Sequence, residues 1–372
     1  MKIAVISTVW FPLSHTDVIV TRWVKPYHTD AGYGWTKPES EIASIFIEQT
    51  PVNDIGHHFC KTNGIPVFNS IRDALTLGGD KLAVDAVLLI GEHGDYPHNE
   101  FRQRLYPRKR MFDAITEVFR ESGRSVPIFN DKHFSWDFDH SCAMLAVAEE
   151  LKFPLYGGSS LTHCPVEPGP AVKDGEDIRE ALALFHGDPD NYGFHTMEFV
   201  QAQIETRYGG ETGIRAVRSF EGQAVREAVS SGDIPRDLLI KALEHHRYTC
   251  VEETLNFVLE RVENLLAYQL EHRDGLRVTH VAMPKYVSEW IVAVRTNEGE
   301  IRSSRILGGD GGPSFFSNFA FLNSKVEQFF QTGQPPTPVL RTHLVTGALQ
   351  AALQAVKQNG SWVDTPQLSV VY

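Results

Sequence analysis

The chain has 372 residues, 42% of them hydrophobic and 22% charged, a length that suits two packed domains and a composition that excludes long disordered segments. Its formal net charge is −12, from 35 basic and 47 acidic residues, which argues against nucleic acid or an anionic membrane and favours a small molecule as the main partner. The four cysteines are scattered without a C-x-x-C pair, and the opening MKIAVISTVWF is too short and wrongly flanked for a signal peptide or a membrane span. We therefore expect reduced thiols and a cytoplasmic location.

The first half of the sequence alternates strand-like and helix-like segments. Residues 2–9 (KIAVISTV) form a nearly continuous β-branched run, typical of a parallel strand buried on both faces. Similar runs lie at Ile42–Ile47, Pro66–Phe68, Ala83–Ile90 and Val126–Asn130, and helical patterns lie at 101–122 and 139–152. The alternation predicts an α/β domain over residues 1–155, built on a Rossmann-like doubly wound parallel sheet.

The pattern changes after residue 155. We expect helices at 195–207, 236–245, 252–260 and 340–357, antiparallel strands at Leu276–Ala282 and Glu289–Arg295, a terminal strand at 367–371, and turns at LGGDGGP (307–313) and QPPTP (334–338). These elements predict an α+β domain over 156–372 with a largely antiparallel open sheet, whose last helix could pack back on the first domain. The edges and face of such a sheet need covering, so we expect a homo-oligomer.

Three loops rich in polar residues leave the carboxyl ends of predicted strands, where ligands bind in open α/β sheets. They carry His15 and Asp17; Glu92, His93, Asp95, Tyr96 and His98; and Asn130, Asp131, Lys132 and His133. Such groups could coordinate Zn, Mn or Fe, or form an acid/base network around a polyhydroxy substrate. The metal-ligand candidates are His15, Asp17, His93, Asp95, Asp131 and His133. We assign acid/base roles to Glu92 and Tyr96 and substrate contacts to His98, Asn130 and, after a further strand, His163.

Three segments resemble the Gfo/Idh/MocA family, named for glucose–fructose oxidoreductase and inositol dehydrogenase. DAVLLIGEHGDYPHNE (85–100) matches a strand followed by a T-P-N-x-x-H loop, VPIFNDKH (126–133) matches the E-K-P strand, and NYGFHTME (191–198) matches the D-x-G-x-H-x-x-D helix. The resemblance implies catalytic roles for Lys132 and His195, and we add Asn191 as a substrate contact.

The sequence also departs from that family. Asn191 and Glu198 stand where aspartates are usual, and His133 replaces the proline after the lysine. The first strand is followed by STVWFPLSH (7–15), which lacks the glycines that let a dinucleotide pyrophosphate approach the backbone. Glu48, at the end of the second strand, fits the acid that would bind an NAD ribose.

We therefore predict an enzyme acting on a sugar, polyol or related oxygen-rich small molecule in the crevice between the two domains, with Lys132 and His195 as acid/base groups. Because the glycine loop is missing, the leading interpretation is elimination, hydration, isomerisation or hydrolysis assisted by a divalent metal, without net nicotinamide redox. The alternative is an NAD(P)-dependent oxidoreductase of the family's usual kind, in which Glu48 binds the cofactor. A second alternative is a non-catalytic ligand-binding protein.

Overall fold

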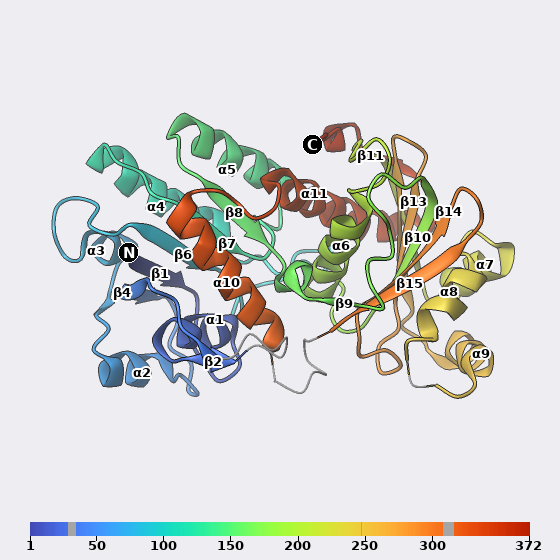
Figure 1. Ribbon diagram of the computed structural model, residues 1–372, viewed down its shortest axis with the longest axis horizontal. Helices are drawn as coiled ribbons and strands as arrows, with labels where there is room; N and C mark the ends of the chain where they lie inside the picture. Colours follow the sequence, from blue (N-terminus) through green and yellow to red (C-terminus); the bar gives the residue numbers. More distant parts are fainter. Residues whose placement is uncertain (29–34, 247, 308–315) are drawn as a thin grey trace. The chain divides into compact units, whose positions relative to one another are not determined.

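A computed structural model describes residues 1–28, 35–246, 248–307 and 316–372. The chain divides into two compact units (Figure 1). Unit 1 contains Met1–Asn99, Arg104–His163 and Pro313–His343, whereas unit 2 contains Glu100–Gln103, Cys164–Gly312 and Leu344–Tyr372. The turn-rich stretch expected at 307–313 falls almost wholly outside the described residues.

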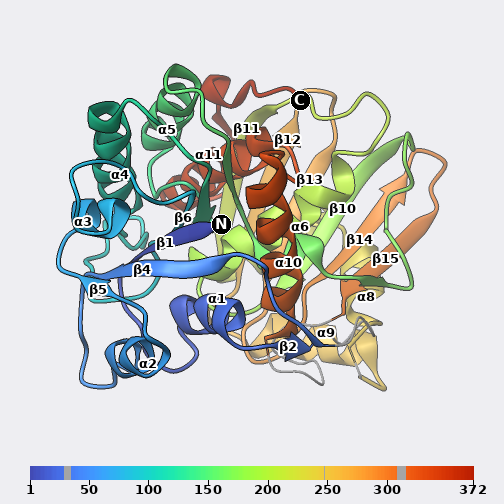
Figure 2. The ribbon, with the colours of Figure 1, turned by 60° about the vertical axis from the view of Figure 1, so that its left-hand side comes forward.

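Unit 1 is built on a six-stranded, fully parallel sheet with the order β5-β4-β1-β6-β7-β8. The strands are β1 (Lys2–Ser7), β4 (Glu41–Ile47), β5 (Val67–Phe68), β6 (Ala86–Ile90), β7 (Ile128–Asp131) and β8 (Leu155–Gly158). Figure 2 shows β4 beside β1, and β5 pairs with β4 at the edge of this sheet. In a separate two-stranded sheet, β2 (Tyr27–His28) pairs antiparallel with β3 (Trp35–Thr36). The parallel sheet predicted from the β-branched runs is thereby confirmed.

Helices cover both faces of this sheet, as the apolar runs require. On one face, α1 (His15–Val24), α2 (Gly56–Asn63) and α10 (Ser317–Thr332) pack on residues such as Ile3, Val5 and Leu88. On the other face, α3 (Ile71–Thr76), α4 (Arg108–Ser122) and α5 (Phe138–Glu150) pack on Ala4 and Ile6. The alternation of neighbouring residues of β1 between these two clusters shows that both faces are buried.

Unit 2 contains an eight-stranded mixed sheet with the order β16-β11-β12-β13-β10-β14-β15-β9. Its strands are β9 (Val166–Glu167), β10 (Ile178–Phe185), β11 (Ile214–Glu221), β12 (Leu266–His272), β13 (Arg277–Ala282), β14 (Ile291–Thr296), β15 (Ile301–Ile306) and β16 (Val363–Asp364). Only β10 and β13 pair in parallel; the other neighbours are antiparallel. This confirms the predicted second domain with a largely antiparallel sheet.

One face of this sheet is covered by α7 (Gln223–Ser231), α8 (Arg236–Leu243) and α9 (Val251–Arg261), which pack on Leu182 and Leu184 of β10. The helix α6 (Asn191–Ile204) lies against β10 and β13 from the other side (Figure 1). The chain itself therefore covers a face that we expected to need a partner, and the homo-oligomer stays a prediction.

Several predicted boundaries differ from the structure. The helix expected from residue 101 begins at Arg108, after Pro107, and the last helix is α11 (Val339–Ala355), followed by the 3-10 turn η2 (Val356–Gln358). The terminal strand expected at 367–371 is wrong, because η3 (Pro366–Leu368) lies there. The short strand β16 instead pairs with β11 a few residues earlier. None of the described helices combines the length and apolar character needed to cross a membrane.

Candidate functional site

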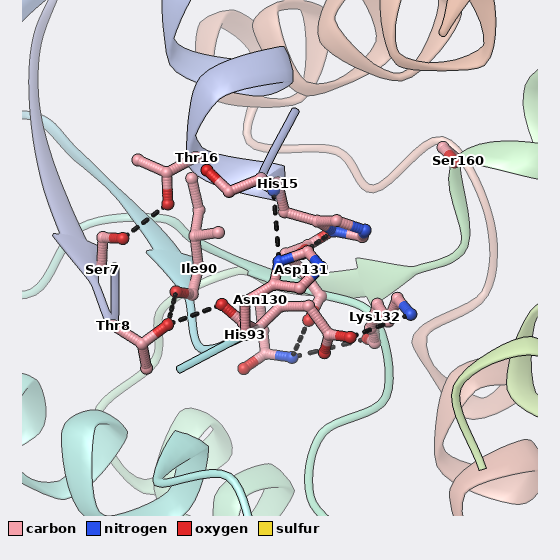
Figure 3. Close-up of polar contacts among 12 residues, drawn as sticks. Ser7, Thr8, His15, Thr16, Ile90, His93, Asn130, Asp131, Lys132 and Ser160 are labelled. Carbon is pink, nitrogen blue, oxygen red and sulfur yellow. Dashed lines mark hydrogen bonds and ion pairs between the residues drawn. The ribbon is translucent and has the colours of Figure 1, made fainter. Parts of the chain in front are cut away.

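The carboxyl ends of β1, β6 and β7 meet at one edge of the first sheet because these strands are neighbours in it. The backbone N–H of Thr8 donates to the carbonyl oxygen of Ile90 at 3.2 Å, and the Thr8 hydroxyl donates to that of Glu92 at 2.6 Å. Figure 3 shows that Thr8, His93, Asn130 and Asp131 consequently lie together. The three polar loops predicted at the carboxyl ends of the strands therefore lie together.

The core of this site is a buried ion network. Glu92 Oε1 lies 3.1 Å from Lys132 Nζ, and Glu92 Oε2 accepts a hydrogen bond from Arg108 Nη2. Arg108 Nη1 lies 3.1 Å from Nε2 of His133. All four residues are almost fully buried, so one carboxylate holds two cations away from water.

Lys132 occupies a special backbone position just after β7. Its φ of +67° is in the left-handed region that side chains other than glycine rarely adopt. Its backbone exchanges two hydrogen bonds with Gly158 at the end of β8, and the Asn130 amide donates to the carbonyl oxygen of His133 at 3.0 Å. These bonds over-determine a turn that would otherwise cost energy, and they fix where the lysine side chain begins.

A second pair lies beside this network. Nδ1 of His15 lies 2.5 Å from Oδ2 of Asp131, which places an imidazole and a carboxylate in the geometry of an oriented acid/base group. The backbone N–H of His15 donates to Nδ1 of His93 at 3.4 Å. His93 also has a positive φ, +66°. The loop after β6 and the loop after β7 therefore each contain a strained residue, His93 and Lys132.

Burial and charge set the protonation of the network. Burial alone raises the pKa of Glu92, but the charges of Lys132 and Arg108 outweigh it and hold that pKa well below its ordinary value. Burial, assisted by Arg108, lowers the pKa of His133 well below its ordinary value. Burial and the neighbouring His15 lower the pKa of His93 to about 4. At neutral pH the site therefore contains an ionised Glu92 and neutral imidazoles at His93 and His133.

The structure corrects the predicted metal site. Among the residues described, no three His, Cys, Asp or Glu side chains come together as metal ligands would. His15 and Asp131 are paired with each other, the Asp17 carboxylate accepts from the backbone N–H of Leu13 at 2.9 Å, and His133 faces a guanidinium. Asp95 is exposed. His15, Asp17, Asp131 and His133 therefore bond to protein partners and do not share a common centre.

Glu48, the predicted ribose ligand, belongs to a neighbouring cluster. Its carboxylate accepts a hydrogen bond from the Tyr96 hydroxyl at 2.6 Å and another from Arg110. Burial, and then the hydrogen bond to Glu48, raise the pKa of Tyr96, so this phenol keeps its proton at neutral pH and donates a hydrogen bond to Glu48. His98 is exposed and bridges Arg104 through its backbone. The acid/base role predicted for Tyr96 has no support in this arrangement.

The β1–α1 corner is the place where Rossmann-like folds bind the pyrophosphate of a dinucleotide. Ser14 caps α1, and its Oγ accepts from the N–H groups of Phe11 and Asp17. Pro12 has no N–H, and the N–H of Leu13 is bonded to Asp17. A pyrophosphate needs free amides and close backbone approach at this place. The residues present do not fit the dinucleotide in that manner.

A third polar group lies at the end of β8. The Tyr156 hydroxyl lies 2.5 Å from Nε2 of His163, in the 3-10 helix η1 (Ser160–His163), and the Asn318 amide donates to Ser160 Oγ at 2.7 Å. Burial, and then Arg341, lower the pKa of His163 to about 3. His163 is thus a neutral imidazole held by Tyr156.

The remaining predicted residues belong to unit 2. Asn191 begins α6, and His195 is buried one turn later on the same helix. The His195 ring lies 6.3 Å from that of Trp290 and 6.4 Å from that of Tyr192. Tyr192 and Trp290 are themselves stacked, with an angle of 5° between their planes. His195 therefore sits in an aromatic cluster of its own unit.

Sequence reasoning missed Arg108 and Asn318. Arg108 follows Pro107 at the start of α4, a position typical of an exposed helix end, and nothing in the sequence marks it as fully buried. The available signal was Gly91, where a side chain would lie 2.6 Å from the Arg108 Cγ atom. Asn318, which holds Ser160, follows the undescribed residues 308–315 and gave no local signal.

No family model matches the chain, and no curated protein sequence matches it. Solved structures do share its fold. GenD2 from gentamicin A biosynthesis, solved with NAD, superposes with a TM-score of 0.61 at 13% identity, covering 98% of this chain and 96% of that one. Myo-inositol 2-dehydrogenase from Lactobacillus plantarum gives a TM-score of 0.60 at 11% identity, covering 98% and 99%.

A third structure, UDP-N-acetylglucosamine 3-dehydrogenase GnnA from Acidithiobacillus ferrooxidans, gives a TM-score of 0.55 at 12% identity, covering 96% of this chain and 98% of that one. The chain therefore has the fold of the Gfo/Idh/MocA dehydrogenases over nearly its whole length. The resemblance inferred from three short segments is confirmed at the level of the fold.

Proposed function

We propose that this chain is an enzyme that acts on a sugar, polyol or related oxygen-rich small molecule by proton transfer at the carboxyl edge of the first sheet. The observation that carries the proposal is the buried network of Glu92, Lys132 and Arg108. Burying three charges costs free energy, and in proteins the replacement of buried ion pairs by well-packed apolar residues is often neutral or stabilising. Perturbed ionisable groups gathered at strand ends are typical of active sites.

The roles follow from the contacts. Lys132 supplies an ammonium proton, Glu92 and the strained turn hold that ammonium in place, and Arg108 keeps Glu92 ionised. The His15–Asp131 pair offers a second proton-transfer group beside it. An ammonium and an imidazole together can protonate one oxygen of a polyhydroxy compound and deprotonate another group. We keep His195 as a further acid/base candidate on the resemblance of its helix motif.

An NAD(P)-dependent oxidoreductase is the second candidate. The specific support for it is the fold, which is shared with structures of sugar and polyol dehydrogenases, one of them solved with NAD. The contacts of the β1–α1 corner do not support it, because the amides there are bonded to Ser14 and Asp17. The first candidate therefore agrees better with the described site, and the second with the comparisons.

A substrate screen tests the proposal. The purified chain is incubated with a panel of aldoses, ketoses, inositols and sugar acids, with and without NAD+ and NADP+, and conversion is followed by proton NMR. Conversion without added nucleotide supports the first candidate, and conversion only with it supports the second. If no compound is converted while several bind, the chain is a ligand-binding protein and the proposal fails.

A further inference from the structure

In dinucleotide-binding Rossmann folds the diphosphate binds at the start of the helix that follows the first strand. In this chain the Asp17 carboxylate belongs to the first turn of that helix, α1. Its Oδ2 accepts from the backbone N–H of Leu13 at 2.9 Å, and its Oδ1 accepts from the indole Nε1 of Trp10 at 3.3 Å. We propose that Asp17 acts as a built-in anion at the start of α1, so that this corner excludes the diphosphate of a nicotinamide dinucleotide and the site takes a substrate without a diphosphate. The inference deepens the proposed function and rests on it only for the position of the site.

The indole that holds Asp17 is itself built into the core. Trp10 is fully buried in the cluster beneath α1 and α2. Gly56 makes room for it, since a Cβ atom at Gly56 would lie 2.7 Å from that of Trp10. The carbonyl oxygen of Trp10 accepts from Ile55 at 3.0 Å. Trp10 is therefore a fixed donor, and the carboxylate that it orients is fixed as well.

Charge supports the same conclusion. The start of a helix attracts an anion, and in α1 that anion is Asp17, in the first turn. A dinucleotide would bring two further negative charges to a corner that already holds one. Like charges repel, and the Asp17 carboxylate, which is only partly exposed, would meet those of the diphosphate at the start of α1.

The chain offers a matched control for the capping role of Asp17. In α3, Ser70 caps the helix and Asp73 stands three residues later, as Ser14 and Asp17 do in α1. Ser70 Oγ accepts from the N–H of Asp73 at 3.0 Å. Replacing Asp73 therefore perturbs a helix cap of the same type away from the β1–α1 corner.

The test is a binding titration that does not depend on turnover. The full chain, Asp17→Asn, Asp17→Ala and Asp73→Asn are titrated with NADH and NADPH to ~1 mM, the upper range of ordinary substrate affinities, following energy transfer from tryptophan and the heat of binding. We expect no saturable binding by the full chain or by Asp73→Asn. In the Asp17 variants we expect binding to become at least about tenfold tighter, because one like charge has been removed.

Two results would overturn the proposal. One is saturable binding of either nucleotide by the unmodified chain below ~0.1 mM. The other is a folded Asp17→Asn protein that binds no better than the unmodified chain, with folding verified by circular dichroism. If both Asp17 variants fail to fold, the titration of the unmodified chain still decides. Because binding alone is measured, a negative substrate screen would leave this result intact, and the two failures can be told apart.

Discussion

Lys132 and Glu92 form a buried ion pair, with 3.1 Å between Nζ and Oε1 and only 4% and 2% of the two side chains exposed. The lysine comes from the end of β7 and the glutamate from the loop after β6. Arg108 shares the same carboxylate. A pair of this kind stabilises the fold weakly at best compared with apolar residues, so its presence at the ligand-binding edge of the sheet points to chemistry.

Removing one partner of the pair should destabilise unit 1. We expect Lys132→Met to lower the free energy of unfolding by about 3 kcal/mol, because Glu92 loses a neighbour in a buried place. Glu92→Gln should cost more, since two cations are then left without their carboxylate. Urea denaturation measures both. The control is Lys109→Met, which breaks the more exposed pair with Asp113 and should change stability by less than about 1 kcal/mol. Equal losses of stability in Lys132→Met and Lys109→Met would show that Lys132 and Glu92 do not form a buried ion pair.

Ser14 should matter more than an ordinary helix cap. Its Oγ accepts from two N–H groups, those of Phe11 and Asp17, and its side chain is fully buried. We expect Ser14→Ala to cost about 2 kcal/mol and Ser70→Ala, at the partly exposed cap of α3, about 1 kcal/mol. Thermal unfolding of the two variants provides the comparison. The reverse order would show that the β1–α1 loop is not held by Ser14.

Gly91 leaves space for Arg108. In Gly91→Ala the new methyl group would lie 2.6 Å from the Arg108 Cγ atom and 3.5 Å from its Cα atom. Because Arg108 is fully buried, it cannot swing into water, and we expect a loss of about 1–3 kcal/mol. Gly79→Ala, at an exposed turn where a Cβ atom would lie 3.3 Å from the Thr76 carbonyl oxygen, should cost less than Gly91→Ala. Calorimetry of the two variants would settle the matter, and a neutral Gly91→Ala would mean that Arg108 is loosely held.

The free energy of unfolding should fall as the pH falls below 6.5, the ordinary pKa of histidine. Burial lowers the pKa of His93 to about 4 and that of His163 to about 3. Above pH 6.5 both residues are neutral in the folded and the unfolded chain and contribute nothing to the pH dependence. Between pH 6.5 and 4, only the unfolded chain takes up these protons, so the free energy of unfolding falls as the pH falls.

Denaturant titrations at pH 7.5, 6, 5 and 4.5 measure this slope. His163→Asn should make the slope shallower, although the variant also loses the partner of Tyr156 and is less stable at pH 7.5. His58→Gln, at an exposed position of α2, should leave the slope unchanged. A stability that is flat from pH 7 to 5, or a slope insensitive to His163, would show that these imidazoles are not buried as described.

The parallel sheet could be predicted because its strands are buried on both faces, which makes runs such as Ala86–Ile90 continuously apolar. The same order of strands placed Glu92, Asp131 and Lys132 at one edge. The pairing within the site could not be predicted. Whether Asp131 bonds to His15 or to Lys132 depends on the positive φ of Lys132 and on the burial of Arg108, and both arise from contacts between distant segments.

Helix α10 was missed for a related reason. Its apolar residues, Phe319, Leu322 and Phe329, complete a core whose other members come from the first half of the chain. A sequence divided at residue 155 assigns them to the second domain. The predicted metal site failed similarly, since residue types suited to a metal were paired with one another and with Arg108.

The most direct test of the account is the rate of Lys132→Gln on the first compound that the substrate screen finds to be converted. The matched control is Lys109→Gln, and folding of both variants is verified by circular dichroism. We expect Lys132→Gln to lower kcat at least about 100-fold, the usual contribution of a positioned acid or base, and Lys109→Gln to keep the full rate. A folded Lys132→Gln protein that turns over as fast as its control would contradict it.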